Sequence, residues 1–367
     1  MQTVKNWGNR PWSVEFQAKV LPFPDEVEVA VVGGGFTGLA AAAWLKRIDP
    51  RRSVALLDAE RIGSGASGFT GGLALAESAV GDLPGLDDVL GGYAKILKEL
   101  QVDGDLNLPG VYELGRSKAL ENTPMRWKDS GELCAVKEME GGTIHPGKVV
   151  SGLGRAAEQN GVILFENARV EACEFGKTIL LKTAKGNLSA KQALFATNAF
   201  SLELTNWKQR AESCFTIAIA TEEVAPSIIE EIGMGEGKPF YTVDLPYLWG
   251  RLLGRQIVFG AGLVHFDDWR EMMTLDVEHG ESAEAFTRLE QRVHQLHPVL
   301  RDVKITHRWG GPICIAEGWR PIFEFHAKSD HAIVLGAYSG HGVAQSVYLG
   351  AWAAEILTGK RGLPDWE

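Results

Sequence analysis

The stretch Val29-Ala-Val-Val-Gly33-Gly-Gly35-Phe-Thr-Gly38 predicts a dinucleotide-binding β-turn-α unit. Residues 27–32 are nearly all apolar, as expected of a strand that is buried on both faces. Gly33 and Gly35 let the backbone turn tightly and approach a pyrophosphate, and Gly38 lets the helix pack closely on the strand. The helix expected from residue 36 to about 48 points its free N–H groups at that pyrophosphate.

An acid follows at the position where such a unit binds ribose. A second strand over residues 53–57 ends at Asp58, which lies 58 − 38 = 20 positions after the last glycine. A carboxylate at this distance accepts hydrogen bonds from ribose hydroxyls and disfavours the 2′-phosphate of NADP. The motif does not separate NAD from FAD, because both contain an ADP half. A glycine-rich turn without a ligand is the remaining structural interpretation.

The composition narrows the class of protein. The chain has 367 residues, of which 45% are apolar, and a net charge of −10. This acidic balance argues against nucleic acid as a partner. Cys134, Cys173, Cys214 and Cys314 lie far apart without metal-ligand spacing, so we expect reduced thiols in a cytoplasmic protein and no metal. No apolar run is long enough to span a membrane, and the N-terminus has no signal-peptide pattern.

Two further glycine-rich loops point to a long ligand. One is Gly63-Ser-Gly65-Ala-Ser67-Gly68-Phe-Thr-Gly71-Gly72, too long for a simple turn. The other, Gly336-Ala-Tyr338-Ser-Gly340-His341-Gly342, follows an expected strand at residues 332–335 and opens an expected helix that runs to about 357. The loop at Gly33 and the loop at Gly340 each follow a strand and open a helix, and two such loops far apart in the sequence favour one ligand held at both ends. FAD is long enough for this.

Apolar periodicity predicts the intervening elements. We expect helices over residues 90–100, 146–160 and 282–296. Strands are expected at residues 162–165, 168–175, 178–183, 192–197, 215–221 and 257–263. Residues 1–26, with Trp7 and Trp12, are expected to form an extended lead-in that packs on the body.

Four segments resemble the FAD-dependent oxidoreductases of the D-amino-acid oxidase family, which includes glycine oxidase, sarcosine oxidase and γ-glutamylputrescine oxidase. They are the stretch around Gly33, the loop from Gly65 to Gly72, Leu194-Phe-Ala196-Thr197-Asn198-Ala199, and the loop from Gly336 to Val343. His145-Pro146 and the helix after it are similar to the middle segment of that family. The γ-glutamylputrescine oxidase branch resembles the chain most.

The resemblance implies an α/β fold. A Rossmann-like FAD-binding domain of the GR2 type is expected over residues 27–82, 144–205 and 305–360. An interleaved α+β substrate domain, built on an antiparallel sheet, is expected over residues 83–143 and 206–304. The residues expected to bind FAD, without a covalent link, are Gly33, Gly35, Phe36, Thr37, Gly38, Asp58, Ala59, Ala66, Ser67, Gly68, Gly71, Gly72, Val170, Ala196, Thr197, Asn198, Ala199, Gly311, Gly340, His341, Gly342, Val343, Ala344 and Gln345.

The implied activity is oxidation of a C–N bond in an amine or amino-acid derivative, with hydride transfer to flavin N5 and formation of an imine. The catalytic residues are not identified. Candidates for the substrate pocket are His145, Tyr247, Trp249 and His265, together with Tyr241, because aromatic walls bind amines by cation–π contact. Core packing is the alternative role for these rings. The electron acceptor is O2 or another compound.

The chain departs from the family pattern at several positions. The loop usually written Gly-Arg-Asn-Gly-Gly reads Gly68-Phe-Thr-Gly71-Gly72, so a charge near the cofactor is missing. Ile313 stands where α-amino-acid oxidases carry a carboxylate-binding arginine, unless Arg251 or Arg320 replaces it. Val258 stands where sarcosine oxidases carry an oxygen-activating lysine, which favours a dehydrogenase. Cys314 does not align with the flavin-linking cysteine and is expected to be a buried neutral thiol.

These departures keep two other functions open. One is an NAD-linked dehydrogenase, which leaves the loop around Gly340 unexplained. The other is a flavin-binding subunit of a hetero-oligomeric dehydrogenase, or a flavoprotein without turnover. A homo-oligomer is equally compatible with the sequence.

Overall fold

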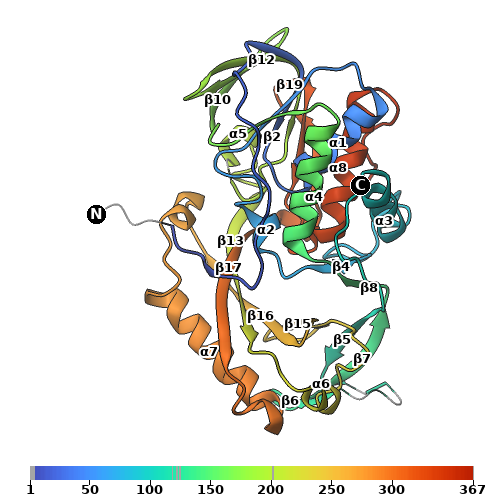
Figure 1. Cartoon of the computed structure of the whole chain (residues 1–367), viewed down its shortest axis with the longest axis vertical. Coiled ribbons are helices and arrows are strands. Elements are labelled where there is room, and N and C mark those ends of the chain that lie inside the picture. The colour runs from blue at the N-terminus through green and yellow to red at the C-terminus, as the bar shows by residue number, and fades with distance from the viewer. Residues whose placement is uncertain (1–4, 118, 121–122, 124, 201, 367) are drawn as a thin grey trace.

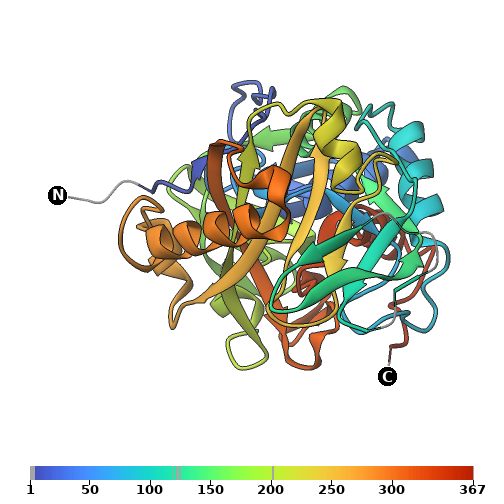
Figure 2. The same cartoon turned by 90° about the horizontal axis from the view of Figure 1, so that it is seen from below.

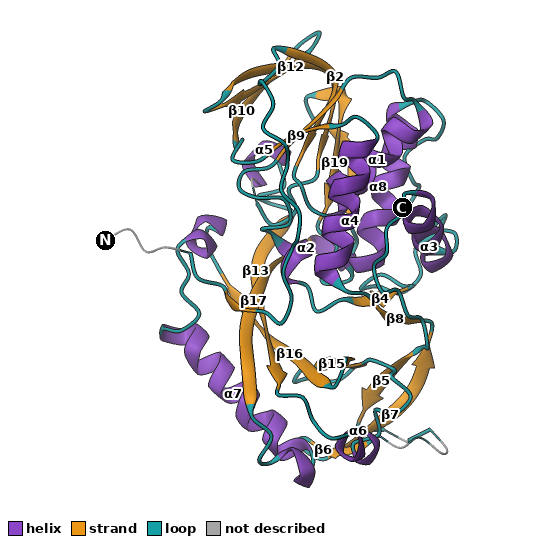
Figure 3. Ribbon diagram, in the orientation of Figure 1, coloured by secondary structure: helices purple, strands orange, loops and turns teal. Residues whose placement is uncertain are grey.

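The computed structural model describes every residue except 1–4, 118, 121–122, 124, 201 and 367. Two large sheets follow one another along the long axis (Figure 1). Helices gather beside the upper sheet, and the lower half consists mainly of strands (Figure 3).

The upper sheet has eight strands, and its centre is parallel. β2 pairs with β12 on one side and with β3 on the other, β3 pairs with β9, and β12 also pairs with β19, all in parallel register. β10, β11 and β18 complete it by antiparallel pairing. The bounds are β2 Glu26–Val32, β3 Val54–Leu57, β9 Ile163–Phe165, β10 Val170–Phe175, β11 Ile179–Thr183, β12 Gly186–Phe195, β18 Ile322–His326 and β19 Ser329–Gly336.

Three helices pack together beside this sheet: α1 (Phe36–Ile48), α4 (Pro146–Gln159) and α8 (Gly342–Leu357) (Figure 1). α1 is buried almost throughout because its alanines leave room for close neighbours. Gly350 of α8 lies against α1, and a Cβ there would stand 2.5 Å from the carbonyl oxygen of Thr37. α3 (Val89–Glu99) packs against α8 from outside.

The lower sheet has nine strands in the order β1-β17-β13-β16-β15-β14-β5-β7-β6. All neighbours are antiparallel except β14 and β5. α7 (Gly280–Leu296) crosses this sheet and buries Phe286, Leu289, Val293 and Leu296 (Figure 2). The bounds are β1 Gly8–Asn9, β5 Val111–Gly115, β6 Arg126–Lys128, β7 Glu132–Met139, β13 Ala211–Thr221, β14 Phe240–Thr242, β15 Trp249–Leu253, β16 Gln256–His265 and β17 Ile305–Ala316.

The remaining elements are short. They are β4 (Leu73–Leu75), β8 (Gly141–Thr143), α2 (Ala66–Phe69), α5 (Leu202–Thr205), α6 (Pro226–Glu231) and the 3-10 turns Trp269–Met273, Pro298–Leu300 and Glu317–Trp319. In the described part of the chain, no helix has both the length and the apolar character needed to cross a bilayer.

The three helices and the strands expected from periodicity are present, with ends that differ by a few residues. The largest differences are at β12, which begins at Gly186 rather than 192, and at β13, which begins at Ala211 rather than 215. The expected domain boundary at residue 305 places β17 with the nucleotide-binding part, yet β17 pairs with β13 along its length in the lower sheet. Residues 6–16 pack on the body, with Trp7 and Trp12 buried.

Candidate active site

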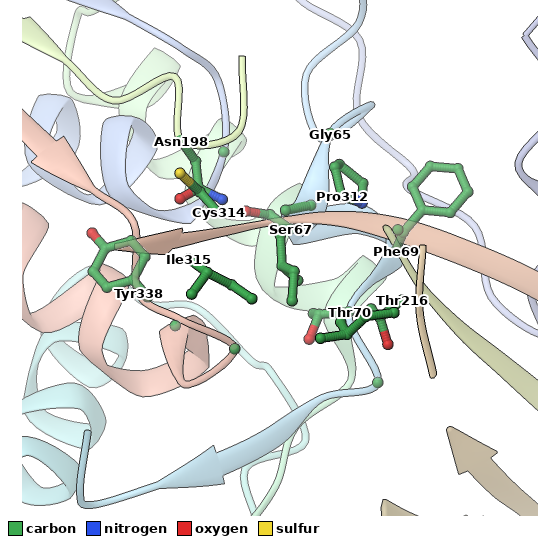
Figure 4. Close-up of a pocket in the computed structure, with 18 of the residues that line it drawn as sticks. Gly65, Ser67, Phe69, Thr70, Asn198, Thr216, Pro312, Cys314, Ile315 and Tyr338 are labelled. Atoms are coloured by element: carbon green, nitrogen blue, oxygen red, sulfur yellow. The ribbon is translucent and has the colours of Figure 1, made fainter. Parts of the chain in front are cut away.

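One large cavity connects the two halves of the molecule. Its volume is about 1590 Å³, and it extends from the carboxyl ends of β2 and β3 to the face of the lower sheet. Figure 4 shows part of its lining, which includes Ser67, Thr70, Asn198, Thr216 and Tyr338. An opening at the carboxyl end of a parallel sheet is where α/β folds bind nucleotides.

The first glycine loop forms the end of this cavity. Gly33 has φ +110°, and a Cβ on it would stand 2.5 Å from the carbonyl oxygen of Ala196, so only glycine fits. Gly38 lies against the loop, with 1.9 Å between an added Cβ and the Gly33 carbonyl oxygen. The tight turn leaves the N-terminus of α1 facing the cavity, which suits an anion.

Asp58 organises the same loop. Its Oδ2 accepts a hydrogen bond from the Gly34 N–H at 2.7 Å, and its Oδ1 accepts one from the Glu60 N–H at 2.9 Å. Burial raises the pKa of this carboxyl above its ordinary value, although both backbone donors act in the opposite direction. Each carboxylate oxygen retains a lone pair, and the Asp58 side chain lines the cavity. Asp58 can therefore accept hydrogen bonds from ribose hydroxyls.

The loop of residues 63–68 repeats the geometry of the first loop. Gly63 has φ +74°, Gly65 precedes α2 in extended conformation, and a Cβ on Gly68 would stand 2.0 Å from the Gly63 carbonyl oxygen. The two loops are joined, because Ser67 Oγ accepts a hydrogen bond from the Phe36 N–H at 2.9 Å. The sequence shows this repeat as two Gly-x-Gly-x-x-Gly patterns, Gly33 to Gly38 and Gly63 to Gly68.

The loop between β19 and α8 closes the cavity from the other side. Thr37 Oγ1 and the Tyr338 hydroxyl are 2.8 Å apart, and Asn198 Oδ1 accepts a hydrogen bond from the Ala337 N–H at 2.9 Å. Asn198, Ala337 and Ser339 all have φ between +48° and +54°. Such strained non-glycine residues cluster at functional sites, where the surrounding structure holds them.

The lining fits a dinucleotide. The buried hydroxyl of Thr197 has no hydrogen-bond partner and belongs to a residue that lines the cavity, as expected of a group that bonds to a ligand. Gly340 has φ +89°, and a Cβ there would meet nothing within 4 Å. The loop therefore leaves open space next to the start of α8.

Most residues expected to bind FAD line this cavity. These are Gly33, Gly35, Phe36, Thr37, Asp58, Ala59, Ala66, Ser67, Gly71, Gly72, Val170, Ala196, Thr197, Asn198, Gly311, Gly340, His341, Gly342 and Val343. The other expected residues, Gly38, Gly68, Ala199, Ala344 and Gln345, lie behind the lining. Gly38 and Gly68 are needed for loop packing, and Gln345 is fully buried in α8.

Three of the substrate-pocket candidates line the cavity, namely Tyr247, Trp249 and His265. His145 does not: its Nδ1 accepts a hydrogen bond from the Lys148 N–H at 3.2 Å, so it caps α4. Tyr241 also lies outside the lining, and its hydroxyl is 2.9 Å from carboxylate oxygens of both Glu77 and Glu113.

Trp249 occupies a slot made by two glycines. A Cβ on Gly71 would stand 2.0 Å from its Cη2, and a Cβ on Gly260 would stand 2.1 Å from its Cε2. Gly71 belongs to the second glycine loop, and Gly260 belongs to the neighbouring strand β16. The indole is thereby fixed between the nucleotide-binding half and the lower sheet.

Arg251 and Arg320, the two candidates to replace the carboxylate-binding arginine of α-amino-acid oxidases, do not line the cavity. Arg251 is 2% exposed and donates hydrogen bonds to the carbonyl oxygens of Ile144 and Gly72. Arg320 donates to the Trp366 carbonyl oxygen at 2.7 Å. The lining does contain Arg292, whose guanidinium forms two hydrogen bonds with the Asp129 carboxylate, at 2.6 and 3.0 Å.

The N-terminal segment brings a charge to the loop that lacks its family arginine. The Arg10 guanidinium lies 4.0 Å from the ring centroid of Phe69, and burial lowers its pKa to about 10. The indoles of Trp12 and Trp309 donate to the Gly68 and Phe69 carbonyl oxygens at 2.9 and 3.1 Å. Sequence reasoning missed this arrangement because residues 5–12 carry no recognisable motif.

Three other residues named in the sequence analysis, Cys314, Val258 and His341, carry no charge in the structure. Cys314 lines the cavity, and burial raises the pKa of its thiol. Val258 is fully buried and packs with Ala218 and Trp309. Burial lowers the pKa of His341, which lines the cavity as a neutral imidazole at pH 7.

Other lining residues had no signal in the sequence. They are contributed by β13, β16 and α7, and include Thr216, Ala218, Gly262, Leu263, Glu281, Glu284 and Arg288. Their positions depend on strand pairing and helix docking across the lower sheet, which local patterns do not specify.

Comparison with known proteins agrees with this geometry. A family model described as "FAD dependent oxidoreductase" matches residues 28–356. The chain belongs to this family. Its cofactor is FAD, and the protein is a flavin-dependent oxidoreductase.

Curated relatives cover most of the chain. A probable oxidoreductase OrdL of Rhizobium meliloti is 27% identical over 93% of this chain and 85% of its own length. The gamma-glutamylputrescine oxidoreductase of Escherichia coli is 26% identical over 90% and 84%. The sarcosine oxidase subunit beta of R. meliloti is 26% identical over 86% and 80%.

A solved structure is similar in fold. Glycine oxidase from Geobacillus kaustophilus superimposes with a TM-score of 0.71 at 18% identity, covering 92% of this chain and 96% of that one.

Proposed function

We propose that this protein oxidises the C–N bond of an amine to an imine, using non-covalently bound FAD. One observation carries the proposal. The cavity is lined at one end by the nucleotide-binding loops of the family, and it continues without a break to Trp249, Tyr247 and His265 at the lower sheet. When bound, FAD supplies at N5 the acceptor for the hydride that leaves the substrate carbon.

The residues of the chain supply binding and orientation. The loops at Gly33 and Gly63, with Asp58, would hold the ADP half. The free N–H groups at the start of α8 would face the other half and stabilise negative charge that develops there on reduction. The fixed indole of Trp249 would form one wall for the amine and attract its cationic form.

The substrate class we favour is an amine without an α-carboxylate. Ile313 cannot pair with a carboxylate, and Arg251 is already bonded to the carbonyl oxygens of Ile144 and Gly72. Of the arginines in the lining, Arg288 pairs with Glu284, and Arg292 pairs with Asp129, whose side chain is 6% exposed. Asp129 is also bonded to Arg116 at 3.0 Å, so turning Arg292 toward a substrate would remove one of the two guanidinium groups that pair with this buried carboxylate.

A matched panel tests this proposal. Each amine is assayed beside its α-carboxylated analogue, with detection of the carbonyl product that the imine yields on hydrolysis, and with O2 and an artificial electron acceptor in parallel. We expect turnover of amines and a much lower kcat/KM for the carboxylated analogues. A preference for the α-amino acids would contradict the proposed substrate class.

The absence of a lysine at Val258 supports a dehydrogenase, so we propose that the artificial acceptor gives faster turnover than O2. Release of the flavin by acid precipitation tests the non-covalent link. Burial keeps Cys314 as a thiol, which supports release. Yellow colour retained in the pellet would contradict it.

A second candidate function is that of a flavin-binding subunit in a hetero-oligomer. The likeness to a sarcosine oxidase subunit beta favours it. The loop that carries Tyr247 also exposes Val243 and Leu245, at 54% and 85%. Turnover of an amine by the purified single chain would exclude this function.

A further inference from the structure

Three potential metal ligands meet in the lower sheet where β13 begins and β16 ends. Glu212 and Cys214 stand two residues apart on β13, so their side chains lie on the same face. His265 ends β16 and pairs directly with Cys214 across the strands. Directly opposed residues bring their side chains close together. The pairing of β13 with β16 therefore gathers a carboxylate, a thiol and an imidazole that are distant in sequence.

The distances agree with a tetrahedral metal site. His265 Nδ1 lies 3.4 Å from Cys214 Sγ and 3.7 Å from a carboxylate oxygen of Glu212. The three ligand atoms all lie within 4.8 Å of one another. Ligands bound at about 2.0–2.3 Å to a tetrahedral zinc ion stand roughly 3.3–3.6 Å apart. Small side-chain rotations would place all three around one ion.

The donor set selects the metal. A thiolate, an imidazole and a carboxylate together favour Zn²⁺ over Mg²⁺ or Ca²⁺, which prefer oxygen ligands. Thiolate and carboxylate would also balance the charge of the ion. Glu212 and His265 are each more than half exposed, so an ion can enter from solvent.

The site adjoins the cavity. His265 is one of the residues that line the cavity. Thr216 also lines it and is the next residue after Cys214 on the same face of β13. Three protein ligands leave a fourth position of a tetrahedral ion free for water or another ligand. A metal ion here would thus lie at the cavity wall.

We propose that Glu212, Cys214 and His265 bind one zinc ion at the cavity edge, with the fourth coordination position open. This proposal does not depend on the reaction or the substrate assigned above. The competing explanation of the short contact is a simple thiol–imidazole hydrogen bond.

Zinc binding by the tag-free flavoprotein tests the proposal. The protein is treated with a chelator, dialysed, and titrated with ZnCl2 in competition with a fluorescent zinc indicator. X-ray absorption at the zinc edge then reports the ligand atoms. We expect one zinc per chain, with one sulfur at about 2.3 Å and nitrogen or oxygen ligands at about 2.0–2.1 Å.

Variants separate this site from incidental binding. Glu212→Gln and His265→Gln alter exposed side chains and leave the core intact, and Cys214→Ser removes the sulfur. Each is expected to weaken zinc binding by at least about 100-fold, more than the loss of an outer-shell partner. Cys173→Ser and His331→Gln, on other strands, serve as controls and should bind as the unmodified protein does.

The opposite results would overturn the proposal. No zinc bound by the unmodified protein, a coordination shell without sulfur, or full affinity in any one of the three site variants would each contradict it.

Discussion

The hydroxyls of Thr37 and Tyr338 lie 2.8 Å apart and join two glycine loops that are 301 residues distant in sequence. Thr37 is in the first turn of α1, and Tyr338 precedes α8. Both residues are buried and line the cavity. The bond therefore ties the two ends of the expected FAD site to each other, and its loss should affect folding and cofactor binding together.

Removal of the hydrogen bond between Thr37 and Tyr338 should lower the stability of the fold, and the effects of the two substitutions should not be additive. We expect Tyr338→Phe and Thr37→Val each to reduce the free energy of unfolding by about 0.5–1.5 kcal/mol, because a buried hydroxyl loses its partner. The double variant should lose less than the sum of the two. Urea unfolding and FAD titration measure both effects. Strict additivity would show that the two hydroxyls do not interact.

Asp58 should control FAD affinity. In Asp58→Ala the Gly34 and Glu60 N–H groups lose their acceptor, and the ribose hydroxyls lose theirs. Charge-assisted hydrogen bonds of this kind contribute about 1.5–3 kcal/mol each, so we expect FAD to bind at least about tenfold more weakly. Fluorescence titration of the apoprotein measures this affinity. Asp25→Asn, before β2, is the control, and equal affinity in Asp58→Ala would be inconsistent with the assigned role.

The slot for Trp249 should be sensitive to a single methyl group. Gly260→Ala places a Cβ 2.1 Å from the indole of Trp249, which must then leave its present position. We expect a higher KM for the amine and a smaller change in FAD affinity, because Gly260 lies on the lower sheet. Gly362→Ala, where an added Cβ meets nothing within 4 Å, is the matched control. An unchanged KM would remove Trp249 from the substrate wall.

His326 should make stability depend on pH. Its Nε2 is 2.9 Å from the Leu204 carbonyl oxygen, and its Nδ1 accepts a hydrogen bond from the Lys328 N–H at 3.1 Å. This pattern requires a neutral ring, and burial lowers the pKa below 6.5. The unfolded chain therefore binds the proton more tightly. The resulting stability is complete above about pH 6.5 and is lost as the pH falls toward the lowered pKa.

Urea unfolding at about pH 7.5 and about pH 5.5 measures this dependence. His326→Gln should reduce the difference between the two pH values, whereas His331→Gln, on the exposed side of β19, should not. A difference that survives in His326→Gln would assign the pH dependence to other groups.

Local patterns in the sequence predicted the nucleotide-binding half well. The strand, the three glycines and Asp58 span roughly 30 residues, as expected of a βαβ unit. Their geometry in the structure follows from the same steric reasons that identify the motif, such as the positive φ of Gly33. The start of α4 at Pro146 was equally clear, because proline suits the first turn of a helix.

The other half of the site depends on contacts that local patterns do not encode. Among the rings near residues 241–251, Trp249 and Tyr241 pair directly across β15 and β14 and share a face of the sheet, yet Trp249 lines the cavity and the Tyr241 hydroxyl is bonded to Glu77 and Glu113. His145 looked functional because of its segment, yet it caps a helix. The positions of Arg10 and Arg292 depend on contacts with residues distant in sequence, Phe69 for Arg10 and Asp129 for Arg292.

The visible spectrum of the purified protein, recorded anaerobically while an amine is added, tests the central claim most directly. We predict the bands of oxidised flavin, which lose intensity as an amine without an α-carboxylate reduces the cofactor. A protein that carries and takes up no flavin would contradict the assignment of FAD. Flavin bands that no amine in a broad panel can bleach would contradict the proposed oxidation of a C–N bond.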